Sequence, residues 1–222
     1  MVYSPTLFFF IGSGFLSAWL SFSIAYLMLR SWRIVRQDYL LGFPVGFVLL
    51  ALAYVVLDIN YVYPLADAWN LERLLLGSWG FAFLAATYFA RYRPAKIDWS
   101  GEANFALATL GGLAAVSFAL VLILPFSLAP SYLGTSFAIV NLFLLGYVIY
   151  CLSRALKAQT ELSSVVLGFT FLAIEQCSLL LNSLVSAFLW PVVFGELVRI
   201  VGLLMLAIFL VRGFQRGIAQ VK

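Results

Sequence analysis

Long apolar runs follow one another along most of the chain, each close to the roughly 20 residues that a helix needs to cross a bilayer. Seven runs can be read: Leu7–Leu29, Tyr39–Leu57, Leu71–Tyr92, Asn104–Phe126, Ser131–Leu156, Glu161–Trp190 and Val192–Val211. They are continuous rather than alternating, which favours helices over a membrane β-barrel. The sequence therefore predicts an all-α membrane protein, a single-domain bundle of seven transmembrane helices.

Polar residues recur at helical spacing along the sixth and longest run. Glu175, Ser178, Asn182 and Ser186 lie at i, i+3, i+7 and i+11, which places them on one face of a helix. A carboxylate near the middle of a span costs roughly 2.5 to 3.5 kcal/mol on insertion scales, so it normally faces a partner or water rather than lipid. We expect the other helices to pack around this polar face.

Composition supports a membrane protein and excludes several kinds of site. Hydrophobic residues make up 64% of the chain and charged residues 10%, against about 45–50% and 25% in a soluble domain. The absence of histidine excludes bis-histidine haem, most zinc and copper sites, and histidine-based nucleophile triads. We therefore predict no metal site, no cofactor and no enzymatic activity. The dispersed basic residues also give no indication of a nucleic-acid partner.

The basic residues predict which side of the membrane each loop occupies. Of the 13 Lys and Arg residues, 11 follow the first, third, fifth or seventh run. The loops on the other side contain Asp58, Asp67 and Glu72, with Arg73 as their only basic residue. The positive-inside rule then places the N-terminus outside and the C-terminus in the cytoplasm. We expect a multi-pass protein of the cell membrane, with the lipid bilayer as its first partner.

Proline and polar matches between the two halves of the chain suggest an internal duplication with an offset of 124 to 126 residues. The matches pair Pro5-Thr6 with Pro130-Ser131, Tyr26, Arg30 and Arg33 with Tyr150, Arg154 and Lys157, Leu41-Gly42-Phe43 with Leu167-Gly168-Phe169, Asp58 with Asn182, and Glu72 with Glu196. The halves would be parallel repeats related by an axis along the membrane normal. Repeat A covers about residues 5–93, a linker helix about 104–126, and repeat B about 130–214.

This three-plus-one-plus-three plan resembles two families. One is the small seven-helix sugar transporters of SWEET type, and the other is the microbial rhodopsins, whose helix order, short loops and outside N-terminus look similar across nearly the whole chain. The diagnostic motifs of both are absent. The last run contains no lysine that could form a retinal Schiff base, and no proline is followed by glutamine. The resemblance therefore implies a plan of helices and carries over no functional residue.

The polar residues inside the predicted spans are the candidates for chemistry. Arg199 lies about two turns into the last run and needs a carboxylate, for which Glu196, Glu175 and Asp58 are candidates. A structural ion pair that locks the last two helices together is one interpretation, and a polar chamber open to the outside is the other. The residues predicted to line a pathway for a solute or ion are Glu175, Asn182, Arg199, Glu196, Ser178 and Asn141.

Three further features predict how the helices pack. Ser13, Ser17 and Ser21, at i, i+4 and i+8, are expected to allow close helix packing, with the lining of a pore as the alternative. Gly77 and Gly80 indicate close approach in the same way. Pro44 lies inside the second predicted run and is expected to kink it.

The leading functional interpretation is transport of a small solute or ion through a polar cavity between the two three-helix repeats. One alternative is a rhodopsin-like receptor or sensor without covalent retinal, which would act through a partner protein. Another is an accessory subunit of a membrane complex. Assembly as a homo-oligomer or with a partner membrane protein is compatible with all three interpretations.

Overall fold

The computed structural model describes residues 5–35, 38–63, 67–91, 111–117, 130–156, 162–184 and 190–221. The described residues form α1 (Pro5–Val35), the 3-10 helix η1 (Asp38–Leu41), α2 (Gly42–Val62), α3 (Asp67–Arg91), α5 (Pro130–Leu156), α6 (Ser163–Leu184) and α7 (Trp190–Val221). Residues 111–117 form a further short helix within the predicted fourth run, most of which lies outside the described residues. The all-α prediction is confirmed for this part of the chain.

The distribution of polar and apolar side chains is that of a membrane protein. Among the described helices, α1, α2, α5, α6 and α7 are long and apolar enough to cross a bilayer. Large hydrophobic side chains cover their outer faces, as with Phe143 at 77% exposure and Phe15 at 70%. Charged Glu175 and Arg199 are instead buried inside, at 4% and 2% exposure. Because lipid favours apolar outer surfaces and inward-facing charges, the chain is a multi-pass membrane protein. Its seven-span layout and orientation stay predictions.

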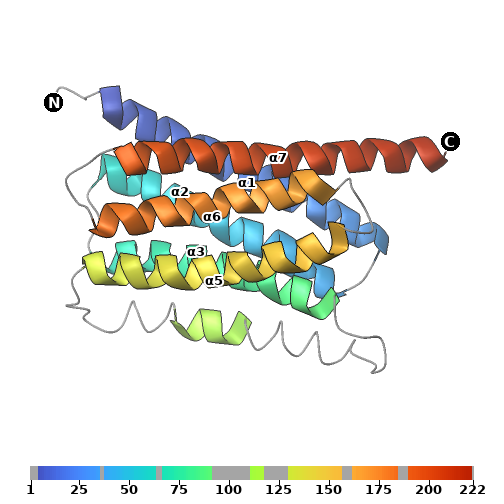
Figure 1. Cartoon of the computed structure of the whole chain (residues 1–222), viewed down its shortest axis with the longest axis horizontal. Helices are drawn as coiled ribbons and strands as arrows, with labels where there is room; N and C mark the ends of the chain where they lie inside the picture. Colours follow the sequence, from blue (N-terminus) through green and yellow to red (C-terminus); the bar gives the residue numbers. More distant parts are fainter. Residues whose placement is uncertain are drawn as a thin grey trace.

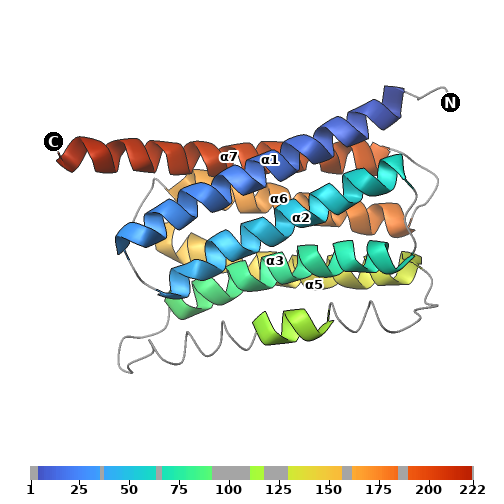
Figure 2. The same ribbon diagram turned by 180° about the vertical axis from the view of Figure 1, so that it is seen from behind.

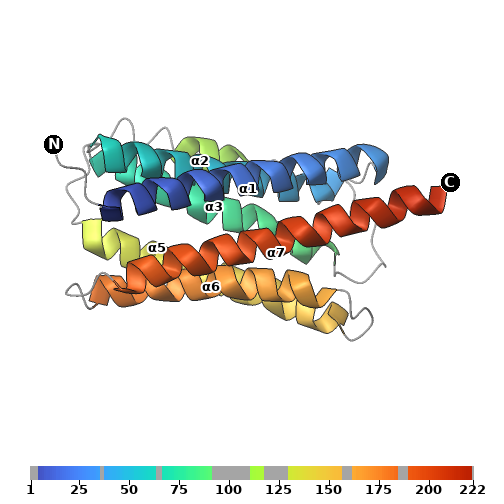
Figure 3. The ribbon, with the colours of Figure 1, turned by 90° about the horizontal axis from the view of Figure 1, so that it is seen from above.

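The long helices form a closed ring in which each packs on two neighbours. Helix α1 packs on α2 and α7, α3 packs on α2 and α5, and α6 packs on α5 and α7. Figures 1 and 2 show α1, α3, α5 and α7 running in one direction and α2 and α6 in the other, with the two chain termini at opposite ends of the bundle. Figure 3 shows α1, α2 and α3 on one side and α5, α6 and α7 on the other. We call the end at which α1 begins the N end and the opposite end the C end.

Two glycine pairs bring neighbouring helices into close contact. A side chain added at Gly46 or Gly80 would lie 2.8 or 2.9 Å from the carbonyl oxygen of the other glycine, which brings α2 and α3 together. Gly168 and Gly202 make the equivalent contact between α6 and α7. Each glycine of the second pair follows its counterpart by 122 positions. This offset differs from the 124 to 126 of the sequence matches, and it pairs Glu196 with Leu74 rather than with Glu72.

Several helix boundaries differ from those expected. The long sixth run ends as α6 at Leu184, and Trp190 begins α7 instead of ending the previous span. Helix α2 begins at Gly42, so Pro44 lies in its first turn. Its missing N–H costs no intrahelical hydrogen bond there, and the predicted kink is not needed. The expected close approach holds at Gly80 but not at Gly77, where an added side chain would meet no atom within 4 Å.

Candidate functional site

Arg199 is the centre of a polar network in the half of the bundle towards the N end. Its Nη1 donates to Oε1 of Glu196 at 3.1 Å and to Oε1 of Glu175 at 3.3 Å. Its Nη2 donates to Oε2 of Glu196. Its Nε donates to Oγ of Ser17 at 2.9 Å. The guanidinium also stacks on the ring of Tyr54, with 4.4 Å between Cζ and the ring centroid. The guanidinium therefore joins four helices: α1, α2, α6 and α7.

Serines of α1 complete the coordination of this ion pair. The hydroxyl of Ser13 donates to Oε2 of Glu196 at 2.6 Å, and the hydroxyl of Ser17 donates to the carbonyl oxygen of Ser13 at 2.7 Å. Both serines are buried, at 4% and 0% exposure. Fixed donors of this kind compensate a buried carboxylate for lost hydration. Ser13 and Ser17, which were expected to ease packing or to line a pore, thus tie α1 to α7.

Unpaired acceptor atoms remain beside the ion pair. Glu175 is 4% exposed, yet its Oε2 has no hydrogen-bond partner among the described residues. Asn141 on α5 donates from its Nδ2 to Oε1 of Gln176 at 3.0 Å, and its buried Oδ1 is likewise unpaired within the described residues. Buried oxygen atoms without a donor are costly. They are therefore the groups that a water molecule, a proton or a small ligand would satisfy.

These groups line a small cavity inside the ring, which we call the polar pocket. Its volume is about 100 Å³. The polar residues that line it are Tyr54, Tyr61, Arg73, Asn141, Glu175, Gln176, Glu196 and Arg199. At roughly 30 Å³ per water molecule, the pocket has room for about three. Glu175 therefore reaches a polar space within the bundle rather than tight apolar packing.

Five buried leucines, which we call the leucine layer, lie beside the polar pocket on the side of the C end. Leu50, Leu84, Leu145, Leu172 and Leu203 come from five helices, and each is at most 1% exposed. On α6, Leu172 lies one turn from Glu175 towards the C end, and on α7 Leu203 lies one turn from Arg199. Such a layer offers a polar solute no hydrogen-bonding partner.

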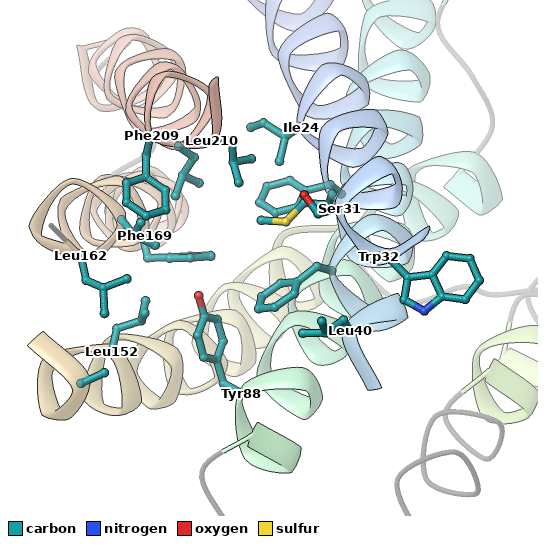
Figure 4. Close-up of a pocket in the computed structure, with 16 residues that line it drawn as sticks. Ile24, Ser31, Trp32, Leu40, Tyr88, Leu152, Leu162, Phe169, Phe209 and Leu210 are labelled. Atoms are coloured by element: carbon teal, nitrogen blue, oxygen red, sulfur yellow. The ribbon is translucent and has the colours of Figure 1, made fainter. Parts of the chain in front are cut away.

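A second and larger space, which we call the apolar cavity, follows beyond the leucine layer. Its volume is about 490 Å³, and its lining includes Phe43, Phe47, Tyr88, Phe169 and Phe209 (Figure 4). A space of this volume is large enough for a small molecule.

Residues 122 positions apart line both spaces in pairs. In the polar pocket the pairs are Ala53 and Glu175, Tyr54 and Gln176, Leu57 and Leu179, Leu74 and Glu196, and Gly77 and Arg199. In the apolar cavity they are Leu40 and Leu162, Phe43 and Val165, Phe47 and Phe169, and Tyr88 and Leu210. Both spaces therefore lie where the two sets of three helices face each other through matching positions.

The polar pocket contains four of the six predicted pathway residues, namely Glu175, Glu196, Arg199 and Asn141. Ser178 is buried but lies outside the pocket lining, where its Oγ donates to the carbonyl oxygen of Ile174 at 3.0 Å and its Cβ packs on Gly195. Asn182 is half-buried and also lies outside the lining. Ser186, the last member of the predicted polar face, falls outside the described residues.

The sequence did not single out two of the residues that line the polar pocket, and it suggested one partner for Arg199 that the structure places elsewhere. Within the described part of the chain, Asp58 forms no ion pair with Arg199, because its carboxylate packs against Gly14 of α1. Tyr54 and Tyr61 line the pocket, and neither stood out from the other aromatic residues of an apolar helix. The i+4 spacing of Ser13 and Ser17 was the available signal for a polar face on α1, but it did not show what that face meets.

Comparisons with protein-family models, with curated proteins and with solved structures find no match to this chain.

Proposed function

We propose that the protein transports a small solute or ion across the membrane, with the polar pocket as its binding site. The proposal rests on two acceptor atoms without a hydrogen-bond donor in the part of the chain that the structure describes, Glu175 Oε2 and Asn141 Oδ1, which are buried beside a space of about 100 Å³. Conformational rigidity alone does not require such atoms, since a fully satisfied network or an apolar core would serve better. A ligand-binding role explains why they are retained.

The size of the pocket limits the solute. A space for about three water molecules suits a proton carried by water, a small cation or a compact hydrogen-bond donor. A sugar would not fit without a large change of shape. Glu175 accepts the ligand in this proposal, while the charge of Arg199 is largely neutralised by Glu196 and fixes the position of Glu175.

The arrangement along the bundle supports an alternating-access mechanism. The leucine layer lies between the polar pocket and the apolar cavity along the helices, and we propose that it keeps the two spaces apart in this state. Contacts of Arg199 with Ser17 and of Glu196 with Ser13 join the two sets of three helices near the N end. We propose that the sets are repeats, and that ligand binding at Glu175 weakens its contact with Arg199 and lets them rock against each other.

The apolar cavity favours the second candidate, a receptor or sensor that acts through a partner protein. Its volume of about 490 Å³ falls in the roughly 300–1,000 Å³ range of small-molecule sites, which are mostly apolar. A receptor would bind its ligand there and move no solute. The two functions therefore differ in whether the purified protein alone produces a flux.

Flux through liposomes tests the proposal. The purified chain would be reconstituted into liposomes loaded with a pH-, sodium- or potassium-sensitive dye, and the matching proton, sodium or potassium gradient would be applied to each. We expect at least one gradient to be dissipated ten-fold faster than in protein-free liposomes. Glu175→Gln should abolish this difference because it removes the accepting charge.

Glu72→Gln is the matched control, since Glu72 is buried on α3 but does not line the polar pocket. It should retain the parent flux. If the folded protein dissipates none of the gradients, or if Glu175→Gln and Glu72→Gln behave alike, the transport proposal is wrong. A partner protein that then co-purifies with the chain would support the receptor.

A further inference from the structure

The apolar cavity is a second candidate binding site, separate from the polar pocket and independent of the transport proposal. Its walls come from α1, η1, α2, α3, α5, α6 and α7, so it lies inside the ring of helices and not on the lipid-facing surface. Figure 4 shows Leu40, Tyr88 and Phe169 converging on a common space from η1, α3 and α6. The Trp32 indole lies at the edge of this space and points away from its centre.

The lining determines that the occupant is apolar over most of its surface. The hydroxyl of Ser31 already donates to the carbonyl oxygen of Leu27 at 3.1 Å. Aromatic and aliphatic side chains make up nearly all of the remaining wall. Water in a space of this kind would find too few partners, and apolar cavities bind apolar guests instead. The edge-to-face packing of Tyr88 with Phe43 and Phe169 leaves flat ring surfaces that suit a hydrocarbon chain.

The charges at the C end indicate what the polar head of such an occupant would be. Arg33 on α1 and Arg212 on α7 lie at the C end, close in sequence to Trp32 and Leu210 of the cavity lining. Arg154 lies at the same end, but its guanidinium stacks on the exposed ring of Tyr150, with 5.1 Å between Cζ and the ring centroid. All three arginines are exposed. Within the described ranges, the one acidic residue at this end is Asp38 of η1. An anionic group at the mouth of the cavity would therefore be attracted.

We propose that the apolar cavity binds a long-chain anionic amphiphile, with its hydrocarbon chain among Phe43, Phe47 and Phe169 and its carboxylate or phosphate near the arginines of the C end. The same chemistry is present in a free fatty acid and in an anionic phospholipid of the bilayer. Binding would fill the void and stabilise the state in which the leucine layer is closed.

Binding of the fluorescent polyene fatty acid cis-parinaric acid tests the site. The full chain would be placed in nanodiscs of zwitterionic phosphatidylcholine, so that no anionic lipid competes. We expect saturable fluorescence enhancement that palmitate reverses. Uncharged hexadecanol, with the same chain length, should need at least a ten-fold higher concentration, and Arg33→Gln combined with Arg212→Gln should remove that difference.

Val165→Phe places a larger side chain in the cavity and should weaken parinarate binding at least ten-fold. Val201→Phe is the matched control, because Val201 on α7 is 44% exposed on the outer surface; it should change binding less than two-fold. If Val165→Phe does not yield folded protein, Ala155→Phe fills the cavity from α5. Unsaturable binding, equal binding in the cavity-filling and control variants, or equal displacement by hexadecanol and palmitate would overturn the proposal.

The source of the amphiphile is distinguished by repeating the titration in nanodiscs that contain phosphatidylglycerol. If a bilayer phospholipid is the occupant, parinarate binding should fall at least five-fold. If the site takes a free fatty acid, the affinity should stay within two-fold of its value in phosphatidylcholine.

Discussion

Charge removal in the Arg199 network should destabilise the protein in a graded way. Arg199→Met leaves Glu175 and Glu196 buried, at 4% and 6% exposure, without their shared cation. Removing one partner of a buried ion pair costs about 3–5 kcal/mol. In a chain of this length each kcal/mol lowers Tm by about 2–4 °C, so the melting temperature should fall by about 6–20 °C.

The two carboxylates should not be equivalent. Glu196 binds the guanidinium through both oxygens and also accepts from Ser13, whereas Glu175 makes one contact of 3.3 Å and leaves its second oxygen unpaired. Glu196→Gln should therefore be less stable than Glu175→Gln by about 1–3 kcal/mol. The double variant Arg199→Met, Glu196→Gln should recover part of the loss caused by Arg199→Met alone, because one uncompensated charge is gone.

The measurement is thermal unfolding of the purified variants in one detergent, followed by far-UV circular dichroism. Arg33→Gln serves as a control, since this arginine is exposed and should leave Tm within 1 or 2 °C. Two results would refute the reasoning. One is an Arg199→Met protein that melts with the parent, and the other is a double variant less stable than the single one.

Three further predictions follow from packing and topology. Gly80→Ala should destabilise the protein by about 1–3 kcal/mol and lower Tm through overpacking, because the new Cβ would lie 2.9 Å from a backbone oxygen of α2. Gly77→Ala should have little effect on Tm, since a Cβ at that position meets no atom of the described residues within 4 Å. Ser17→Ala removes the acceptor of a buried guanidinium N–H and should cost about 1–3 kcal/mol in thermal unfolding. Arg33→Cys, near the C end of the bundle, and Tyr63→Cys, near the N end, should react with a membrane-impermeant maleimide from opposite sides of the membrane. Tyr63→Cys should react from outside. Labelling of both cysteines from the same side would contradict the predicted topology.

Helices and their approximate positions were the most predictable part of the structure. A run of about 20 apolar residues has few alternatives in a membrane, because every backbone polar group must be paired within its own segment. The pairing of Arg199 with Glu196 was also accessible, since i and i+3 positions on one helix lie side by side. The boundary near Trp190 was harder, because an aromatic residue suits either the end of one span or the start of the next.

Contacts between distant helices could not be read from the sequence. Ser13 and Glu196 are separated by 183 positions, and only the rotation of α1 and α7 about their axes brings them together. Asp58 and Glu175 were equal candidates for Arg199 by residue type, yet Gly14 provides a gap on α1 that accommodates Asp58. Gly77 and Gly80 looked alike for the same reason: periodicity places a residue on a face but does not say whether a neighbour approaches it.

The matching of the two halves explains why the polar network lies mainly in the second one. At the offset of 122 positions set by the glycine pairs, Arg199 corresponds to Gly77, Glu175 to Ala53 and Glu196 to Leu74, and all six residues line one pocket of about 100 Å³. Two copies of the network would place two guanidinium groups and four carboxylates in a space that holds about three water molecules. Gly77 and Ala53 are smaller than their counterparts Arg199 and Glu175, whereas Leu74 is about as large as Glu196 but carries no charge. Under the proposed function, a binding site between the two sets of helices is therefore asymmetric, because one set supplies the long charged side chains and the other supplies uncharged ones.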